Sequence, residues 1–102
     1  MSVVFNEKVI ISADTQQVSS SLPDGDVIIL SLKNGVYFGL NPVGARVWAL
    51  IQKPILIKDL INHLLNEYQV DRQQCGHDLD SLLRDLAENG LLQVQPINEV
   101  AA

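Results

Sequence analysis

The sequence contains one cysteine, Cys75, and few aromatic residues, which make up 5% of its 102 residues. A single cysteine cannot form an intramolecular disulfide, which is the usual situation in a reducing compartment. No apolar run approaches the roughly 20 residues that span a bilayer. Residues 1–8 lack the basic and apolar segments of a signal peptide. We therefore expect a cytoplasmic protein that does not enter a membrane.

Basic residues are also scarce, with seven Lys and Arg against twelve Asp and Glu and a net charge of −5. They are scattered, whereas a surface that binds nucleic acid or an anionic membrane gathers its basic residues on one face. The apolar fraction of 47% is that of an ordinary globular protein. The sequence thus predicts a single folded domain over residues 1–95 and a flexible tail over residues 96–102.

Strand-forming residues dominate the first half of the chain. The turn dipeptide Asn34-Gly35 separates two apolar runs and predicts a β-hairpin. If these two residues form the whole loop, Leu32 faces Tyr37 across the pair. The predicted strands are residues 9–11, 26–32 and 36–40, and the polar stretch 14–21 is interpreted as a loop.

Three helices are predicted in the second half. The first begins at Asn41-Pro42, because Asn caps helices and Pro suits the first helical position. Apolar residues then recur at three-and-four spacing over residues 57–68 and again over 75–86. Residues 91–94 are either a short final strand or a cover for the core. Strands followed by helices predict an α+β fold, with a three-stranded antiparallel sheet and then three helices in a winged-helix-like arrangement.

Side chains that could perform catalysis or bind a metal are poorly placed. Cys75 and His77 would point about 200° apart on a helix, so they cannot hold one ion. The serines at 19–21 have no glycine elbow and no nearby base. The acidic side chains over residues 78–88 suit a solvated helix face and oppose insertion into DNA. We predict no enzymatic activity, no catalytic residue, no metal, no cofactor and no nucleic-acid partner.

The third predicted strand, residues 36–40, lacks the features that protect the edge of a sheet. It carries no charge, no proline and no evident bulge. Such an edge is either covered by the chain's own N-terminal segment or left open for a strand from a partner. The residues alone leave both alternatives open.

The residues at the junction of this strand and the first helix resemble the signature of PqqD-like proteins. The resemblance covers residues 26–94 and rests on Tyr37-Phe38-Gly39-Leu40-Asn41 and Val43-Gly44-Ala45-Arg46-Val47-Trp48. PqqD-like proteins are the leader-binding domains for ribosomally made and modified peptides (RiPPs), also called RiPP recognition elements. A stand-alone chain of this length is most similar to the leader-binding proteins of lasso-peptide pathways. One departure is Leu56, where members often have Thr or Ser.

The resemblance implies a winged-helix-like domain whose third strand accepts the leader peptide as an additional strand. Carried over by position, the leader would pair with the backbone of Val36, Tyr37, Phe38 and Gly39. The other wall of its groove would be Cys75, Asp78, Leu79 and Leu82. For Leu79 and Leu82, packing in the core explains the sequence equally well.

The function that the resemblance implies is that of a non-catalytic peptide chaperone. It would bind the leader of a precursor peptide by β-augmentation and present it to a leader peptidase, with the cyclase of the pathway as a further candidate partner. The acidic third helix would favour leaders that carry Lys or Arg. The alternative is a winged-helix regulatory module or a dimerisation module that pairs the same strand edge with a second copy.

Overall fold

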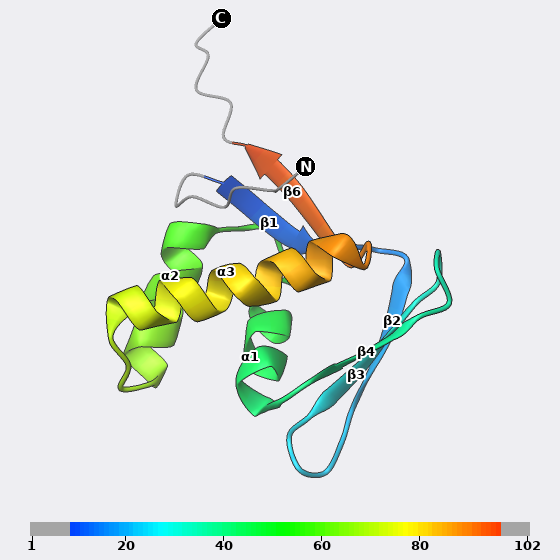
Figure 1. The fold of residues 1–102 in the computed structure, drawn as a ribbon, viewed down its shortest axis with the longest axis horizontal. Helices are drawn as coiled ribbons and strands as arrows, with labels where there is room; N and C mark the ends of the chain where they lie inside the picture. Colours follow the sequence, from blue (N-terminus) through cyan, green and yellow to red (C-terminus); the bar gives the residue numbers. More distant parts are fainter. Residues whose placement is uncertain (1–8, 97–102) are drawn as a thin grey trace, which may run out of the picture.

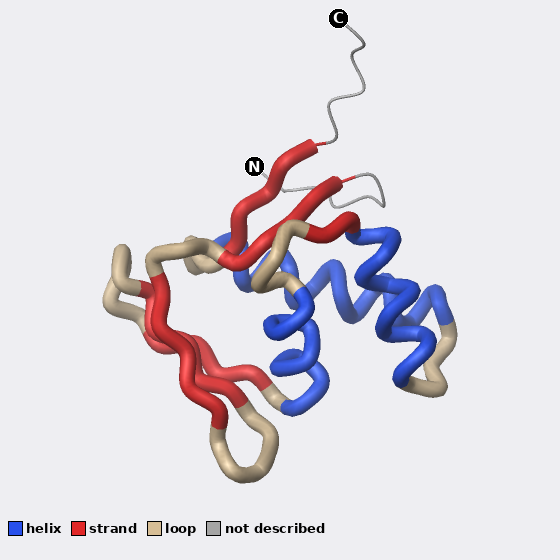
Figure 2. Tube along the Cα trace, turned by 180° about the vertical axis from the view of Figure 1, so that it is seen from behind, coloured by secondary structure: helices blue, strands red, loops and turns tan. Residues whose placement is uncertain are grey.

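The computed structural model describes residues 9–96, which form six strands and three helices. The strands are β1 Val9–Ala13, β2 Gln17–Ser21, β3 Val27–Ser31, β4 Tyr37–Leu40, β5 Ile55–Leu56 and β6 Leu92–Pro96. The helices are α1 Pro42–Leu50, α2 Ile57–Glu67 and α3 Arg72–Glu88. Figures 1 and 2 show β2, β3 and β4 as a sheet that projects to one side of the helices, away from β1 and β6.

The strands form two three-stranded antiparallel sheets. We call the sheet with the order β2-β3-β4 the hairpin sheet, and the sheet with the order β5-β1-β6 the terminal sheet. The predicted α+β class is confirmed, but the prediction that the first strand joins the hairpin is wrong. Strand β1 pairs with β5 and β6 instead, and β2 completes the hairpin sheet.

Strand β2 lies within the polar segment that the sequence suggested was a loop. Four of its five residues are exposed, so it shows none of the apolar alternation that identifies a half-buried strand. Its backbone pairs with β3 from Gln17, opposite Ser31, to Ser21, opposite Val27. The serines of β2 thus form an exposed edge strand, because backbone pairing needs no apolar side chain.

The predicted hairpin is present as β3 and β4, but its register differs from the predicted one by two residues. Tyr37 lies opposite Leu30 rather than Leu32. The loop is wider than two residues and ends at Gly35, whose φ is 68° and whose N–H donates to the Ser31 carbonyl oxygen at 2.8 Å. A shift of two residues leaves the same side chains facing the core, since side chains alternate with a period of two.

The helices begin where the sequence predicts. Asn41 caps α1 by accepting the Gly44 N–H at 2.8 Å, and Asp71 caps α3 by accepting the Gln74 N–H at 3.1 Å. Helix α2 begins after Leu56 without a side-chain cap. One core joins both sheets to the helices, and its fully buried apolar residues are Ile11, Ile29, Val47, Ile51, Leu60, Leu83, Leu86 and Leu91.

The end of the described chain forms a strand. Of the two alternatives for residues 91–94, the strand is the correct one, as β6 pairs with β1 along its length. Pro96, which was predicted to begin the tail, lies opposite Val9 as the last residue of β6. The rest of the predicted tail, residues 97–102, is outside the described residues. Between residues 9 and 96, no helix is long and apolar enough to cross a bilayer.

Candidate functional site

Strand β4 lies at one end of the hairpin sheet and pairs on one side with β3. Within residues 9–96 no strand pairs with its other side, so the edge is open in the part of the chain that the structure describes. Of the predicted edge residues, Val36 precedes β4 and Tyr37, Phe38 and Gly39 lie in it. Tyr37 is 70% exposed.

The pairing of β4 with β3 determines which backbone groups point outward. The Ser31 N–H donates to the Val36 carbonyl oxygen at 2.9 Å, so Val36 directs its backbone toward β3. In an antiparallel ladder the direction alternates from one residue to the next. Tyr37 and Gly39 therefore direct their N–H and C=O groups to the open side, while Phe38 directs its own toward β3. The sequence alone does not make this distinction, because it depends on the register.

The three helices form an apolar groove of about 230 Å³. Cys75, Asp78, Leu79 and Leu82 of α3 all line it, because their spacing of three and four places them on one helix face. Leu79 is also a core residue, only 4% exposed. The groove is completed by residues that the sequence analysis did not identify as site residues: Val43, Val47, Leu64, Tyr68 and Val70.

The groove and the β4 edge are neighbouring surfaces that share no residues. Residues 36–39 are not among those that line the groove. The chain passes from one surface to the other within a few residues, as β4 ends at Leu40, Asn41 caps α1, and Val43 of α1 lines the groove. Val43 and Val47 could have been found from their four-residue spacing on α1. Val70 could not, because it lies in a loop and meets the groove only through the fold.

The groove contains one thiol, that of Cys75. Burial raises the pKa of the Cys75 thiol, and the Asp78 carboxylate raises it further, so the thiol is protonated at neutral pH and is a poor nucleophile. The Gln74 side chain donates to Asp78 at 2.9 Å. Among the described residues, no group of three or more His, Cys, Asp or Glu side chains could hold a metal ion.

An ion pair joins two of the helices that form the groove. The Arg46 guanidinium donates to both carboxylate oxygens of Glu67, each at 2.7 Å. The hydrogen bonds from Arg46 hold the pKa of Glu67 below its usual range. The pair joins α1 to the last residue of α2, and Glu67 directly precedes the groove residue Tyr68.

Comparison with known proteins identifies the family. Residues 26–92 match the sequence profile of the family described as "Coenzyme PQQ synthesis protein D (PqqD)". The matched region includes β3, β4 and all three helices. The chain belongs to the PqqD family. The resemblance to PqqD-like proteins predicted from the sequence is therefore confirmed.

This PqqD-family chain is similar to two solved structures. One is described as "TbiB1 in Complex with the TbiA(beta) Leader Peptide"; it is 33% identical, with a TM-score of 0.73 over 89% of this chain and 99% of that chain. The other is described as "Lasso peptide synthetase B1 complexed with the leader peptide". It is 23% identical, with a TM-score of 0.70 over 81% of this chain and 96% of that chain, so it supports the fold alone. No curated protein sequence matches the chain.

Proposed function

We propose that this PqqD-family chain is a RiPP recognition element that binds the leader segment of a ribosomally made precursor peptide and is not an enzyme. The observation that carries the proposal is the open β4 edge, which leads through Asn41 directly to the apolar groove. A peptide strand added to an edge gains affinity from backbone hydrogen bonds and specificity from side-chain pockets beside it. The solved complex of TbiB1 with a leader peptide supports the proposal.

In this proposal the leader pairs with the outward backbone groups of Tyr37 and Gly39. Val36 and Phe38 belong to the same edge segment, but their backbone groups hold it to β3. Apolar leader side chains would enter the groove against Cys75, Leu79 and Leu82. Asp78 is exposed beside them and would favour a leader that carries Lys or Arg nearby.

The proposed partners follow from the same mode of binding. By fixing the leader in one register, the chain would raise the effective concentration of the attached core peptide near a processing enzyme. We propose a lasso-type pathway, with its leader peptidase and cyclase as the enzymes served. This choice rests on the resemblance of the sequence to the leader-binding proteins of lasso-peptide pathways. We also propose that residues 1–95 form one domain, which β6 extends to Pro96, and that the hairpin β3–β4 is the wing of a winged-helix-like fold.

The experiment that tests the proposal changes one backbone group of the edge. Gly39→Pro removes an outward N–H, whereas Gly39→Ala keeps it, and a Cβ at Gly39 meets no atom within 4 Å. We expect Gly39→Pro to raise the Kd for the leader about 30-fold, which corresponds to about 2 kcal/mol. Gly39→Ala should change the Kd by less than about threefold.

The probe is a fluorescein-labelled synthetic leader from the precursor peptide encoded beside this protein's gene, with the TbiA(beta) leader peptide as a second probe. Binding is measured by fluorescence anisotropy, and circular dichroism shows whether each variant is folded. If neither probe binds the wild type, or if folded Gly39→Pro binds as tightly as the wild type, the proposed function is wrong.

The second candidate function is self-association through the same edge. It is favoured by the absence of charge on β4 and by the exposure of Tyr37 and Val36, 70% and 43%. Sedimentation equilibrium separates the two functions. A dimer that an excess of leader peptide cannot dissociate would support a dimerisation module, while a monomer that binds the leader would exclude it.

A further inference from the structure

Strand β4 is held firmly at one end. At its C-terminal end Leu40 is 5% exposed and Asn41 caps α1. At its N-terminal end the strand follows Val36 and the exposed loop of residues 32–35. Backbone hydrogen bonds to Ser31 hold this end, but an exposed strand end opens locally more readily than a buried one, since its opening involves few buried contacts. The side-chain contacts of the loop therefore add to what keeps the edge in place.

One contact joins the loop to the bend between the two sheets. Lys33 Nζ lies 2.9 Å from Asp14 Oδ2. Asp14 is only 6% exposed, and its other carboxylate oxygen accepts the Gln16 N–H at 2.8 Å. The Gln16 N–H and then Lys33 hold the pKa of Asp14 below its usual range. A buried carboxylate needs such partners, because burying an unpaired charge is costly.

A second contact joins the loop to the C-terminal end of α3. The Asn34 side chain donates to the Asn89 carbonyl oxygen at 3.1 Å, one of the helix-end carbonyls that lack an intrahelical partner. Gly90 makes this approach feasible, because a Cβ there would lie 3.2 Å from Asn34 Nδ2. The Asn34 N–H in turn donates to Ser31 Oγ at 3.3 Å.

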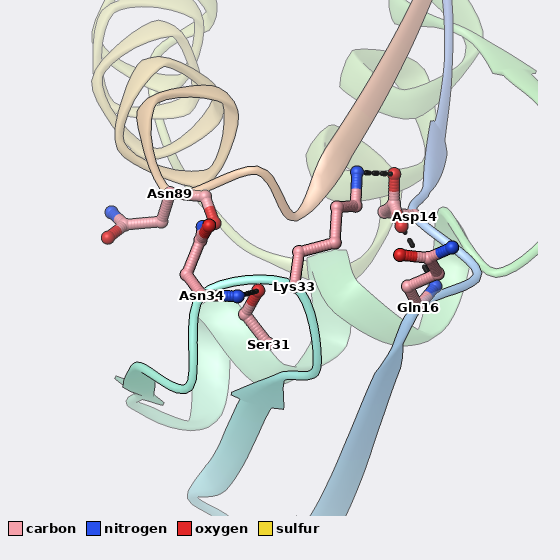
Figure 3. A network of polar contacts seen from close by, with 6 residues as sticks. All are labelled: Asp14, Gln16, Ser31, Lys33, Asn34 and Asn89. Atoms are coloured by element: carbon pink, nitrogen blue, oxygen red, sulfur yellow. Dashed lines mark hydrogen bonds and ion pairs between the residues drawn. The ribbon is translucent and has the colours of Figure 1, made fainter.

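The two loop side chains reach to different parts of the molecule. Figure 3 shows Lys33 extending toward Asp14 and Asn34 extending toward Asn89, on opposite sides of the loop. In the described chain, the buried residues with polar or charged side chains are Asp14 and Ser31, and both take part in these contacts. Buried, fully bonded polar groups fix one geometry more strictly than apolar packing does.

We propose that these contacts form a clasp, made of Asp14, Ser31, Lys33, Asn34 and Asn89, that positions the β4 edge for an incoming leader strand. The inference rests on the proposed function and extends it to residues outside the edge and the groove. Because Asn89 is the C-cap of α3, which carries the groove residues Cys75 to Leu82, the clasp fixes the edge and the groove wall relative to each other.

The clasp acts through the fraction of time for which the edge is in place. When a binding-competent state is only partly populated, the apparent Kd rises by the inverse of its population. With the clasp intact this fraction is close to one. We expect the double variant Lys33→Met/Asn34→Ala to hold the edge in place about a fifth of the time, which raises the leader Kd about fivefold.

The matched control is Arg84→Met. It removes an ion pair of comparable length, 2.7 Å to Asp80, from a cation that is 41% exposed, against 43% for Lys33. The Arg84–Asp80 pair lies within α3 and joins no other element. The control should therefore bind the leader as the wild type does. Lys33→Arg keeps a cation in the clasp and should also retain the affinity.

The measurements are anisotropy with the two labelled leaders and hydrogen exchange of the β4 amides in the free protein. The proposal expects the double variant to lose affinity and to exchange its Phe38 amide faster. Its thermal midpoint should fall below that of Arg84→Met, because Asp14 is buried and loses its cation whereas Asp80 is 35% exposed, so both variants are measured at a temperature at which they are folded. If the double variant unfolds, the milder Asn34→Ala variant is measured in the same way.

The outcomes separate this proposal from the proposed function. If the wild type binds a leader and the folded double variant binds equally well, the clasp is not a positioning device, while the proposed function stands. If the wild type binds neither leader, the proposed function is overturned. Hydrogen exchange of the Phe38 amide still tests the clasp in that case. If this amide exchanges at the same rate in the double variant and in the wild type, the clasp does not hold the edge.

Discussion

The hairpin sheet has two edges, and they differ in what lies beside them. Strands β2 and β4 both end the sheet, and neither carries a charge or a proline. Strand β4 passes through Asn41 into α1 and the apolar groove. Strand β2 is followed by an exposed turn at residues 22–25 and lines no part of that groove. Unpaired backbone groups allow a strand to be added at either edge, whereas side-chain pockets beside an edge select which strand binds there.

The strongest test of this difference removes a side chain from the groove wall. Leu79→Ala should lower the free energy of unfolding by about 2–5 kcal/mol, because Leu79 is a core residue as well as a groove residue. Urea unfolding measures this effect, and leader binding is then measured under conditions where the variant is folded. If the folded variant binds the leader normally, the groove does not distinguish β4 from β2.

A weaker test changes the groove with little effect on the core. Val43 is 49% exposed and lines the groove on α1. Val43→Ser should raise the leader Kd about fivefold, which is about 1 kcal/mol, through the loss of apolar contact. Val18→Ser on β2 is the matched control, since Val18 is 56% exposed and lies away from the groove. Equal losses from both variants would contradict the assignment of the leader to the β4 side.

Acid should loosen the clasp that holds β4. The pKa of Asp14 is lower in the folded protein than the unfolded value of about 4. Its contribution to stability is therefore complete above about pH 4 and is lost as the pH falls through the folded pKa. Lys33 is the charged group paired with Asp14. Urea unfolding from pH 6 down to pH 3 should show that the free energy of unfolding declines less in Asp14→Asn than in the wild type. An equal decline in the two proteins would argue against this role of Asp14.

The smallest expected effect comes from the other edge. The Leu32 N–H donates to the Gln16 carbonyl oxygen at 3.0 Å, so by alternation Ser19 directs its N–H away from β3. Ser19→Pro should therefore leave the sheet folded and change the leader Kd by less than about twofold. Fluorescence anisotropy measures the leader Kd of Ser19→Pro and of Gly39→Pro under the same conditions. A loss as large as that of Gly39→Pro would mean that the leader binds to β2.

Local patterns in the sequence were sufficient for much of the fold. The cap at Asn41, the hairpin and the three helices depend on residues that are close in the chain, and the family signature spans the strand–helix junction. Strand β2 was missed because its serines are exposed and only backbone pairing makes them a strand. The hairpin register was wrong because the loop begins at Leu32, directly after the pair of Ser31 and Val36, rather than consisting of Asn34 and Gly35 alone.

Contacts between distant residues could not be predicted in this way. The four α3 residues chosen from the family resemblance do lie together in the groove, since helical spacing brings them to one face. The contribution of Val70, and the choice of Tyr37 and Gly39 as the outward residues, needed the register and the fold. In the clasp, Lys33 bonds to Asp14, which is 19 positions away in the sequence, and Asn34 bonds to Asn89, which is 55 positions away. No sequence motif predicts either contact.

The single thiol of the chain lies in the groove, at Cys75. Its reactivity can therefore report whether a peptide occupies the groove, without an engineered label. A small alkylating reagent would modify one site, at a rate limited by burial and by the raised pKa. A peptide in the groove would shield that site, so the rate of alkylation would measure directly how much of the protein is loaded.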